Sequence, residues 1–130
     1  GTWVRAASLR LELLVELAPL AADLVVCGAD RDQVGVLILP SPDARALGDG
    51  ATGDAIHGPG LTRAIGQRLA ARLTRGSAAR VTRVRVLQEP ASLADGEITA
   101  KGNLNFRKLL QVRAQSLDLL YADDPATITI

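Results

Sequence analysis

The spacing of apolar residues at the start of the chain predicts a short strand followed by a helix. Residues 1–6, Gly-Thr-Trp-Val-Arg-Ala, alternate between polar and apolar side chains, as a half-buried strand does. Leu9, Leu13 and Leu17 then recur every fourth position, which is the period of one helix face. Ser8 directly precedes this pattern, so we expect it to cap the helix.

Two dense apolar stretches, residues 24–27 and 34–39, are expected to pair as a hairpin in the middle of a sheet. The intervening Gly-Ala-Asp-Arg-Asp-Gln contains the glycine and aspartates typical of turns. Pro40 has no backbone N–H to donate and so ends the second strand. The composition then shifts to Gly, Asp and Pro. There we expect one turn of helix over residues 42–47 and a flexible surface loop over residues 48–60.

A second amphipathic helix, a strand and a third helix complete the pattern. Residues 82–87, Thr-Arg-Val-Arg-Val-Leu, alternate in a way that predicts a strand with one face buried and the other in water. The third helix is expected to begin near Asn105. The apolar residues expected to face inward are Leu61, Ile65, Leu69 and Leu73 of the second helix, and Leu109, Leu110, Val112, Leu117 and Leu120 of the third.

The order strand, helix, strand, strand, helix, strand, helix predicts the α+β class. We expect residues 1–130 to form a single domain, a small mixed sheet with an N-terminal hairpin region packed in two layers against two to three helices. A chain of this length can bury a real core. The expected core is one contiguous cluster of Leu9, Leu13, Leu17, Val25, Val36, Ile38, Leu61, Ile65, Leu69, Val84, Val86 and Leu109.

The composition argues against several classes of partner. With a formal net charge of +1 and acids and bases mixed along the chain, nothing indicates a nucleic acid or an anionic membrane as partner. Trp3, Phe106 and Tyr121 are the only aromatic residues, too few for a base-stacking surface. No apolar run approaches the roughly 20 residues of a membrane span. The single Cys27 is expected to be a buried reduced thiol, which favours a cytoplasmic domain.

No metal or nucleotide motif stands out. There is no Walker-type loop and no Gly-x-Gly-x-x-Gly that opens a helix. His57 lies in the glycine-rich loop without a suitably spaced Ser or Cys, so we expect a solvated histidine. A hairpin turn explains Asp30 and Asp32, and a solvated C-terminal patch explains Asp123 and Asp124. We therefore expect no metal site.

The arginines allow two interpretations. If the second helix and the following strand are neighbours, their arginines form a cationic surface suited to phosphates. Alternatively, they cover a solvated helix face and the outer face of an edge strand, which we prefer, although the two are not exclusive. The residues concerned are Arg68, Arg72, Arg75, Arg80, Arg83 and Arg85.

Lys101 stands apart because the chain has thirteen arginines and two lysines. It lies in a Thr-Ala-Lys-Gly turn flanked by Gly96 and Gly102. We expect residues 99–103 to form an exposed loop with Lys101 in solvent. A lysine there is a compact point charge that suits a phosphate or carboxylate and would act by electrostatic stabilisation. The same pattern also fits an ordinary solvated lysine.

Residues 96–110, Gly-Glu-Ile-Thr-Ala-Lys-Gly-Asn-Leu-Asn-Phe-Arg-Lys-Leu-Leu, resemble the closing motif of the C-terminal domain of adenylate-forming enzymes, the acyl-CoA and aryl-CoA synthetase superfamily. The opening Gly-Thr-Trp-Val looks like the strand that enters this domain after the interdomain hinge. Residues 21–40 resemble its central hairpin. The Asp30-Arg31-Asp32 turn, the Gly-Thr-Trp-Val-Arg start and the Leu-Tyr-Ala-Asp near Tyr121 look most like feruloyl-CoA synthetases, which act on hydroxycinnamic acids.

The resemblance implies a two-step ligase. A carboxylic acid and Mg-ATP give an acyl-adenylate and pyrophosphate, and the thiol of CoA then displaces AMP. This chain would be a mobile lid beside an N-terminal domain of the same polypeptide, which carries the nucleotide loop and the pocket for an aromatic or acyl acid. Lys101 would bridge the acid and the α-phosphate and withdraw as the lid rotates, with Thr99 and Gly102 contacting the nucleotide. The lid by itself would bind no cofactor and be inactive.

The motif departs from the common family pattern Gly-Lys-hydrophobic-x-Arg. When Gly102 is aligned with that Gly, Asn103 takes the lysine position and Lys101 precedes it. Some relatives carry a Thr-x-Lys-Gly arrangement like this one, and Lys108 projects from a helix and is a poor substitute. Two other functions stay open: a stand-alone α+β binding or regulatory module, and a domain that activates an aryl acid for a carrier protein in place of CoA.

Overall fold

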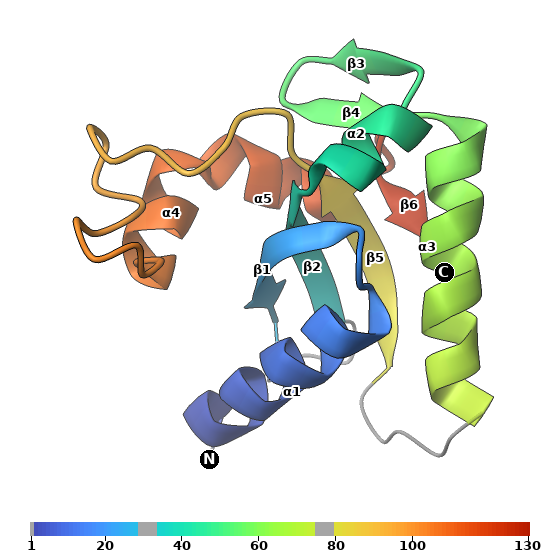
Figure 1. Cartoon of the computed structure of the whole chain (residues 1–130), viewed down its shortest axis with the longest axis horizontal. Coiled ribbons are helices and arrows are strands. Elements are labelled where there is room, and N and C mark those ends of the chain that lie inside the picture. The colour runs from blue at the N-terminus through green and yellow to red at the C-terminus, as the bar shows by residue number, and fades with distance from the viewer. Residues whose placement is uncertain (1, 29–33, 75–79) are drawn as a thin grey trace.

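The computed structural model describes residues 2–28, 34–74 and 80–130, and a four-stranded sheet lies at its centre (Figure 1). The strands lie in the order β1 (Ala21–Cys27), β2 (Val34–Pro40), β5 (Val81–Val86) and β6 (Ile128–Thr129). β1 and β2 are antiparallel, β2 and β5 parallel, and β5 and β6 antiparallel. The predicted hairpin strands and the mixed sheet of an α+β fold are therefore confirmed. The turn with Asp30, Arg31 and Asp32 lies outside the described residues.

Helices cover both faces of this sheet (Figure 1). α1 (Thr2–Glu16) and α3 (Pro59–Thr74) pack on one face, and α4 (Phe106–Val112) and α5 (Ala114–Leu120) on the other. Alternate residues of β2 divide between the two sides: Val36 and Ile38 face the first pair of helices, and Leu37 faces the second pair. Every residue of β2 is buried, so both faces of the strand need a cover.

The core accordingly forms two clusters, one on each side of the sheet, in three layers where two were predicted. All twelve residues of the predicted core are buried, which confirms the selection. Val25 and Leu109 belong to the α4–α5 cluster, however, and the other ten belong to the α1–α3 cluster. The expectation of one contiguous core was wrong because the sheet separates the two sets of side chains.

The predicted N-terminal strand is part of α1. The alternation of residues 1–6 is too short to outweigh the helical pattern that follows. Each residue added to an existing helix gains a backbone hydrogen bond, whereas an isolated strand leaves its backbone groups without partners. The resemblance of this segment to a strand was therefore wrong. Ser8 lies inside α1 and does not cap it.

Residues 50–57 form a hairpin and α3 begins at Pro59, so the prediction of a flexible loop over residues 48–60 was wrong. α2 (Pro42–Leu47) matches the predicted turn of helix, and β3 (Gly50–Thr52) then pairs with β4 (Ala55–His57). Gly53 makes the turn with a φ of +61°, a conformation that suits glycine. His57 is half-buried, and its Nε2 lies 2.8 Å from Thr52 Oγ1 in an exposed contact, so the ring keeps access to solvent and has one neighbour in the hairpin.

The predicted third helix consists of two helices that meet at Arg113. Asn105 caps the first of them, since its Oδ1 accepts a hydrogen bond from the backbone N–H of Lys108 at 3.1 Å. Leu109 and Leu120 are buried as predicted, but Val112 is 46% exposed. Leu109 and Val112 both lie in α4, so they point to different sides of the same short helix, and the inward placement predicted for Val112 was wrong.

Two expectations from composition are addressed by the structure. Cys27 is buried, at 4% exposure, as predicted. Across the described ranges, no helix has the length and apolar character needed to cross a membrane.

Candidate functional site

Lys101 lies at the tip of a tight hairpin, residues 97–105, which we call the lysine hairpin. Its two sides pair at Ile98 and Leu104, and the backbone N–H of Thr99 donates to Asn103 O at 2.8 Å. The Gly102 N–H closes a four-residue turn by donating to Thr99 O at 2.9 Å. Figure 1 shows the segment between β5 and α4, which includes this hairpin, on the α4–α5 side of the sheet. The sequence motif thus folds into a defined turn.

Thr99 and Gly102 build the turn that carries the lysine. The Thr99 hydroxyl accepts a hydrogen bond from the Asn103 N–H at 3.2 Å. Gly102 has a φ of +86°, in the region that side chains with a Cβ rarely adopt. The three residues selected from the sequence, Thr99, Lys101 and Gly102, therefore lie together in one turn. In the structure, Thr99 and Gly102 have conformational roles, and both are exposed.

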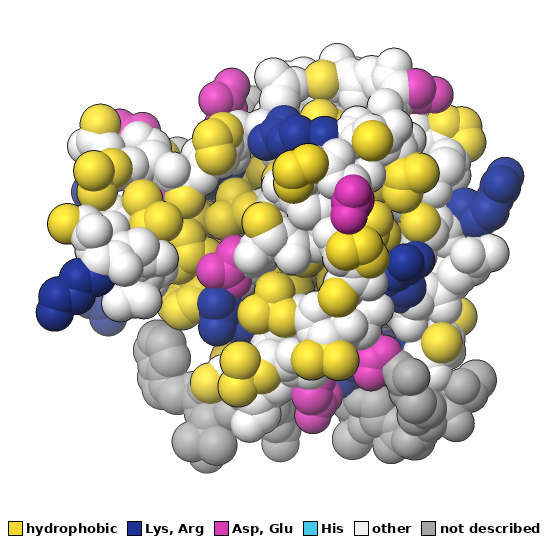
Figure 2. Space-filling model, viewed as in Figure 1, with side chains coloured by type: hydrophobic (Ala, Val, Ile, Leu, Met, Phe, Trp, Pro, Cys, Tyr) yellow, Lys and Arg dark blue, Asp and Glu magenta, His cyan; other side chains and the backbone are white. Residues whose placement is uncertain are grey.

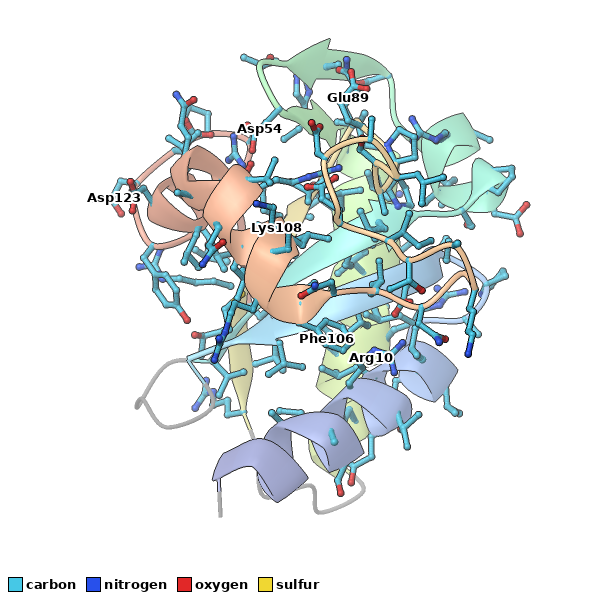
Figure 3. All side chains as sticks on the ribbon, turned by 90° about the vertical axis from the view of Figure 1, so that its left-hand side faces the viewer. Arg10, Asp54, Glu89, Phe106, Lys108 and Asp123 are labelled. Carbon is cyan, nitrogen blue, oxygen red and sulfur yellow. The ribbon has the colours of Figure 1, made fainter. Side chains whose placement is uncertain are left out.

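The two lysines have different surroundings. All of residues 99–103 are exposed, as predicted, and no hydrogen bond or ion pair among the described residues involves the Lys101 ammonium group. Lys108 lies on the first turn of α4 (Figure 3). Its aliphatic stem runs beside the base of the hairpin, since a Cβ added to Gly96 would lie 3.4 Å from Lys108 Cγ. Lys101 is thus the lysine presented at a tip.

The base of the lysine hairpin is held by a buried ion pair. Glu97 is 1% exposed and receives two hydrogen bonds from Arg113, from Nε at 2.7 Å and from Nη2 at 2.9 Å. Burial acts to raise the pKa of Glu97. The hydrogen bonds from Arg113 and from the Ser92 N–H outweigh that effect and hold the pKa below its ordinary value. Glu97 is therefore a carboxylate at neutral pH.

Sequence reasoning missed the importance of this pair, although one signal was present. Arg113 stands four residues after Leu109 and four before Leu117, on the stripe predicted to face inward. A charged residue on an inward stripe requires a buried partner. The partner itself, sixteen residues earlier in a predicted loop, has no signature in the sequence.

Among the described arginines of this set, several are engaged in contacts within the chain, and not all of them are solvated. Arg72 is 3% exposed and pairs with Glu12 of α1 at 2.8 Å. Arg68 and Arg83 donate to backbone carbonyl oxygens. Arg80 is exposed, and Arg75 lies outside the described residues. On the face seen in Figure 2, basic side chains are scattered and not gathered into one patch.

Arg85 lies on the face of the strand that was predicted to be in water, but this side chain is buried. Helix α5 contacts β5 on that face, and Arg85 is 1% exposed. Its Nε donates to Asp54 at 2.9 Å, and its Nη1 donates to Asp124 at 2.8 Å and to Thr127 Oγ1 at 2.9 Å. The arginine thus joins the turn of the β3–β4 hairpin to the C-terminal segment.

Both carboxylates of this cluster are stabilised in the charged form. The hydrogen bond from Arg85 lowers the pKa of Asp54 below its ordinary value of 3.8, against an opposing effect of burial. The same arginine and the Ala126 N–H lower the pKa of Asp124. Asp124 is therefore a structural partner and not part of the solvated patch that was predicted, whereas Asp123 is exposed (Figure 3).

Arg10 connects α1 with the start of α4. Its guanidinium donates from Nη2 to Asp23 Oδ1 at 2.7 Å, and its Cζ lies 5.2 Å from the centroid of the Phe106 ring (Figure 3). Such a cation–π contact is worth about 0.5–1 kcal/mol at an exposed site. The N-terminal end of α4, which follows the lysine hairpin, is thereby also tied to the other face of the sheet.

The sequence and the fold identify the class. The chain belongs to the AMP-binding enzyme C-terminal domain family, which it matches over residues 4–125. This agrees with the α+β fold and with the superfamily indicated by the motif around Lys101. No curated protein matches the chain significantly.

Solved structures with a similar fold include two from carboxylic acid reductase of Segniliparus rugosus. One is the A-PCP didomain in complex with AMP, at 23% identity and a TM-score of 0.62, over 86% of this chain and 16% of that chain. The other is the A domain with AMP and a co-purified carboxylic acid, at 23% identity and a TM-score of 0.61, over 85% of this chain and 17% of that chain. At this identity the likeness shows a shared fold. The chain spans about one sixth of the length of these structures.

Proposed function

We propose that this chain is the mobile C-terminal domain of an AMP-forming carboxylic acid–CoA ligase of the feruloyl-CoA synthetase type. The observation that supports this most directly is the exposed lysine at the tip of a tight hairpin with a fixed base, in a chain of the AMP-binding enzyme C-terminal domain family. A tip residue with no internal partner is available to a surface outside the chain. The proposal includes a cytoplasmic location, which suits a single buried thiol.

In the first half-reaction, a carboxylate oxygen of the acid attacks the α-phosphorus of ATP, and pyrophosphate leaves with the electron pair of the broken P–O bond. The Lys101 ammonium would contact the attacking carboxylate and an α-phosphate oxygen together. It would neutralise their mutual repulsion and align the attack. Lysine suits this role, because it is a point charge on a flexible stem with three donors.

In the second half-reaction, the CoA thiolate attacks the acyl carbon and AMP leaves. We propose that the domain has by then rotated and withdrawn Lys101. Across the described ranges, no three His, Cys, Asp or Glu side chains are placed to hold a metal ion. As part of this proposal, the magnesium of the Mg-ATP substrate, the nucleotide site and the acid pocket belong to an N-terminal domain of the same polypeptide, with Thr99 and Gly102 beside the nucleotide in the closed arrangement.

The test is Lys101→Ala in the full-length ligase. We expect adenylate formation, measured as pyrophosphate release with ferulate and ATP, to slow by roughly 10²–10³, the scale for losing one preorganised donor. Thioester formation from preformed feruloyl-adenylate and CoA should remain near wild type. The matched control is Lys108→Ala, for which both rates should be unchanged. An equal loss in both half-reactions would contradict the role of Lys101, and an inactive Lys108 variant would move the role to that residue.

A second candidate is transfer of the activated acid to a carrier protein in place of CoA. The fold shared with the A-PCP didomain of carboxylic acid reductase favours this as the alternative. The two acceptors are separated by supplying feruloyl-adenylate with either free CoA or a phosphopantetheinylated carrier domain. Acylation of the carrier together with no reaction of CoA would replace the CoA ligase proposal.

A further inference from the structure

Arg113 holds four backbone or side-chain oxygens from the segment that leads to Lys101. Its Nε and Nη2 donate to the two carboxylate oxygens of Glu97, at 2.7 and 2.9 Å. Nη1 donates to Glu89 O at 2.8 Å, and Nη2 also donates to Pro90 O at 2.7 Å. The planar guanidinium therefore fixes the exit from β5 and the base of the lysine hairpin with one group.

Arg113 lies at the junction of the two helices. The residue ends α4 and begins α5 with a φ of −107° and a ψ of 39°, outside the helical region. Its side chain contacts the hairpin base from this junction and is 12% exposed.

Glu97 closes the segment from the other side. One of its carboxylate oxygens also accepts the Ser92 N–H at 2.9 Å. Its backbone N–H donates to Ser92 O, and its backbone oxygen accepts the Asn105 N–H, each at 2.9 Å. Glu97 thus joins the start of the loop, the hairpin base and the N-cap of α4. We call the pair of Glu97 and Arg113 the hairpin clamp.

A buried ion pair is weak evidence for stability, because desolvation of the two charges offsets their attraction, and a well-packed apolar pair is often as stable. What the forked contact adds is a fixed orientation of the hairpin base. Electrostatic stabilisation by a lysine requires a well-placed ammonium group, since a displacement of about 1 Å can cost about 10²-fold in rate. The clamp joins the base of the exposed lysine hairpin to the α4–α5 layer.

We propose that Glu97 and Arg113 are positioning residues that set the place of Lys101 in the adenylation half-reaction. This inference rests on the function proposed above. If the clamp acts through the lysine, the effects of substitutions in the clamp and at Lys101 on the adenylation rate should depend on each other. If the ion pair has a purely structural role, these effects should be independent.

The experiment uses Arg113→Lys in the full-length ligase, which keeps the charge but loses the forked geometry. We expect the kcat of adenylation to fall about 10–100-fold with the KM for ATP nearly unchanged, and thioester formation to remain near wild type. Hydrogen exchange at the Thr99, Gly102 and Asn103 amides should accelerate, because these hydrogen bonds form the turn above the clamp. Arg63→Lys, on the exposed side of α3, is the matched control and should change neither quantity.

The decisive arm is the double variant Lys101→Ala, Arg113→Lys. If the clamp acts through the lysine, the second change should slow adenylation by less than about two-fold beyond Lys101→Ala. The inference would be overturned if the two losses in adenylation rate multiplied in the double variant. It would also be overturned if Arg113→Lys had unchanged amide hydrogen exchange in the lysine hairpin or a wild-type rate of adenylation. If thermal unfolding shows that Arg113→Lys does not fold, Glu97→Gln, which keeps the shape of the side chain, is tested by the same criteria.

The two proposals fail in different ways. If adenylation is slow in Lys101→Ala but normal in Arg113→Lys, the positioning role of the clamp is refuted and the proposed function is unaffected. Normal adenylation in Lys101→Ala removes the proposed function, whatever the exchange rates show.

Discussion

At the scale of single residues, the Arg85 guanidinium is one of two almost fully buried charges among the described residues, the other being the Glu97 carboxylate. Arg85 is 1% exposed and is satisfied by Asp54, Asp124 and Thr127. Losing one partner leaves part of a buried cation uncompensated, which costs more than the intact pair contributes. The arginine therefore makes the β3–β4 turn and the C-terminal segment depend on one another.

Asp54→Asn should destabilise the chain by about 1–3 kcal/mol at pH 7, the range for a hydrogen bond to a charged group. The pKa of Asp54 is depressed below 3.8 in the folded state, so its contribution is complete above that value and is lost as the pH falls through the folded-state pKa. The difference in unfolding free energy between the variant and the wild type should therefore shrink towards zero in strong acid. Urea unfolding at pH 7 and at low pH measures it.

Asp123→Asn is the control for this prediction. Asp123 neighbours Asp124 in sequence but is exposed. The variant should match the wild type at both pH values. A constant difference for Asp54→Asn across the acid range would mean that its carboxylate charge is not what stabilises Arg85.

At the scale of elements, the contact of α5 with β2 depends on one glycine. A Cβ on Gly35 would lie 2.6 Å from Leu120 Cδ2 and 3.2 Å from the Tyr121 hydroxyl. Leu120 is fully buried, so it has no solvent-filled space into which to move. We expect Gly35→Ala to force α5 away from the sheet and to destabilise the chain by about 1–3 kcal/mol, measured by chemical unfolding.

Gly66→Ala is the matched change with the opposite expected sign. Gly66 lies inside α3, and a Cβ there would meet nothing within 4 Å. Alanine in a helix interior should stabilise the chain by about 0.5–1 kcal/mol. If Gly35→Ala were as stable as the wild type, the close approach of α5 to β2 would not exist in solution.

At the scale of the whole molecule, two buried clusters on either side of one sheet should allow the 130-residue chain to fold by itself. We expect one cooperative thermal transition. Calorimetric titration with ATP, AMP or ferulate should show no saturable binding at submillimolar ligand, because Lys101 supplies charge while orientation comes from a partner surface. Formation of feruloyl-adenylate by this chain alone would contradict the role of a lid domain.

The sequence by itself determined the elements whose patterns are local and long. The hairpin strands, α2, α3, the start of a helix near Asn105 and all twelve core residues follow from periodicity and turn chemistry, which act over a few neighbouring residues. The motif around Lys101 indicated the family in the same way, since its residues are contiguous. These features required no knowledge of what packs against them.

The tertiary structure alone decided which faces are covered and which charges are paired. The alternating strand predicts a solvated Arg85, but the side chain is buried where α5, the β3–β4 turn and the C-terminal segment meet β5. Residues 48–60 have the composition of a loop, but residues 50–57 form a hairpin that the contact of Asp54 with Arg85 joins to β5. Arg113 finds Glu97 across sixteen residues. Such partners are set by how distant segments pack, and the free energy of pairing two buried charges has no counterpart in a local pattern of the sequence.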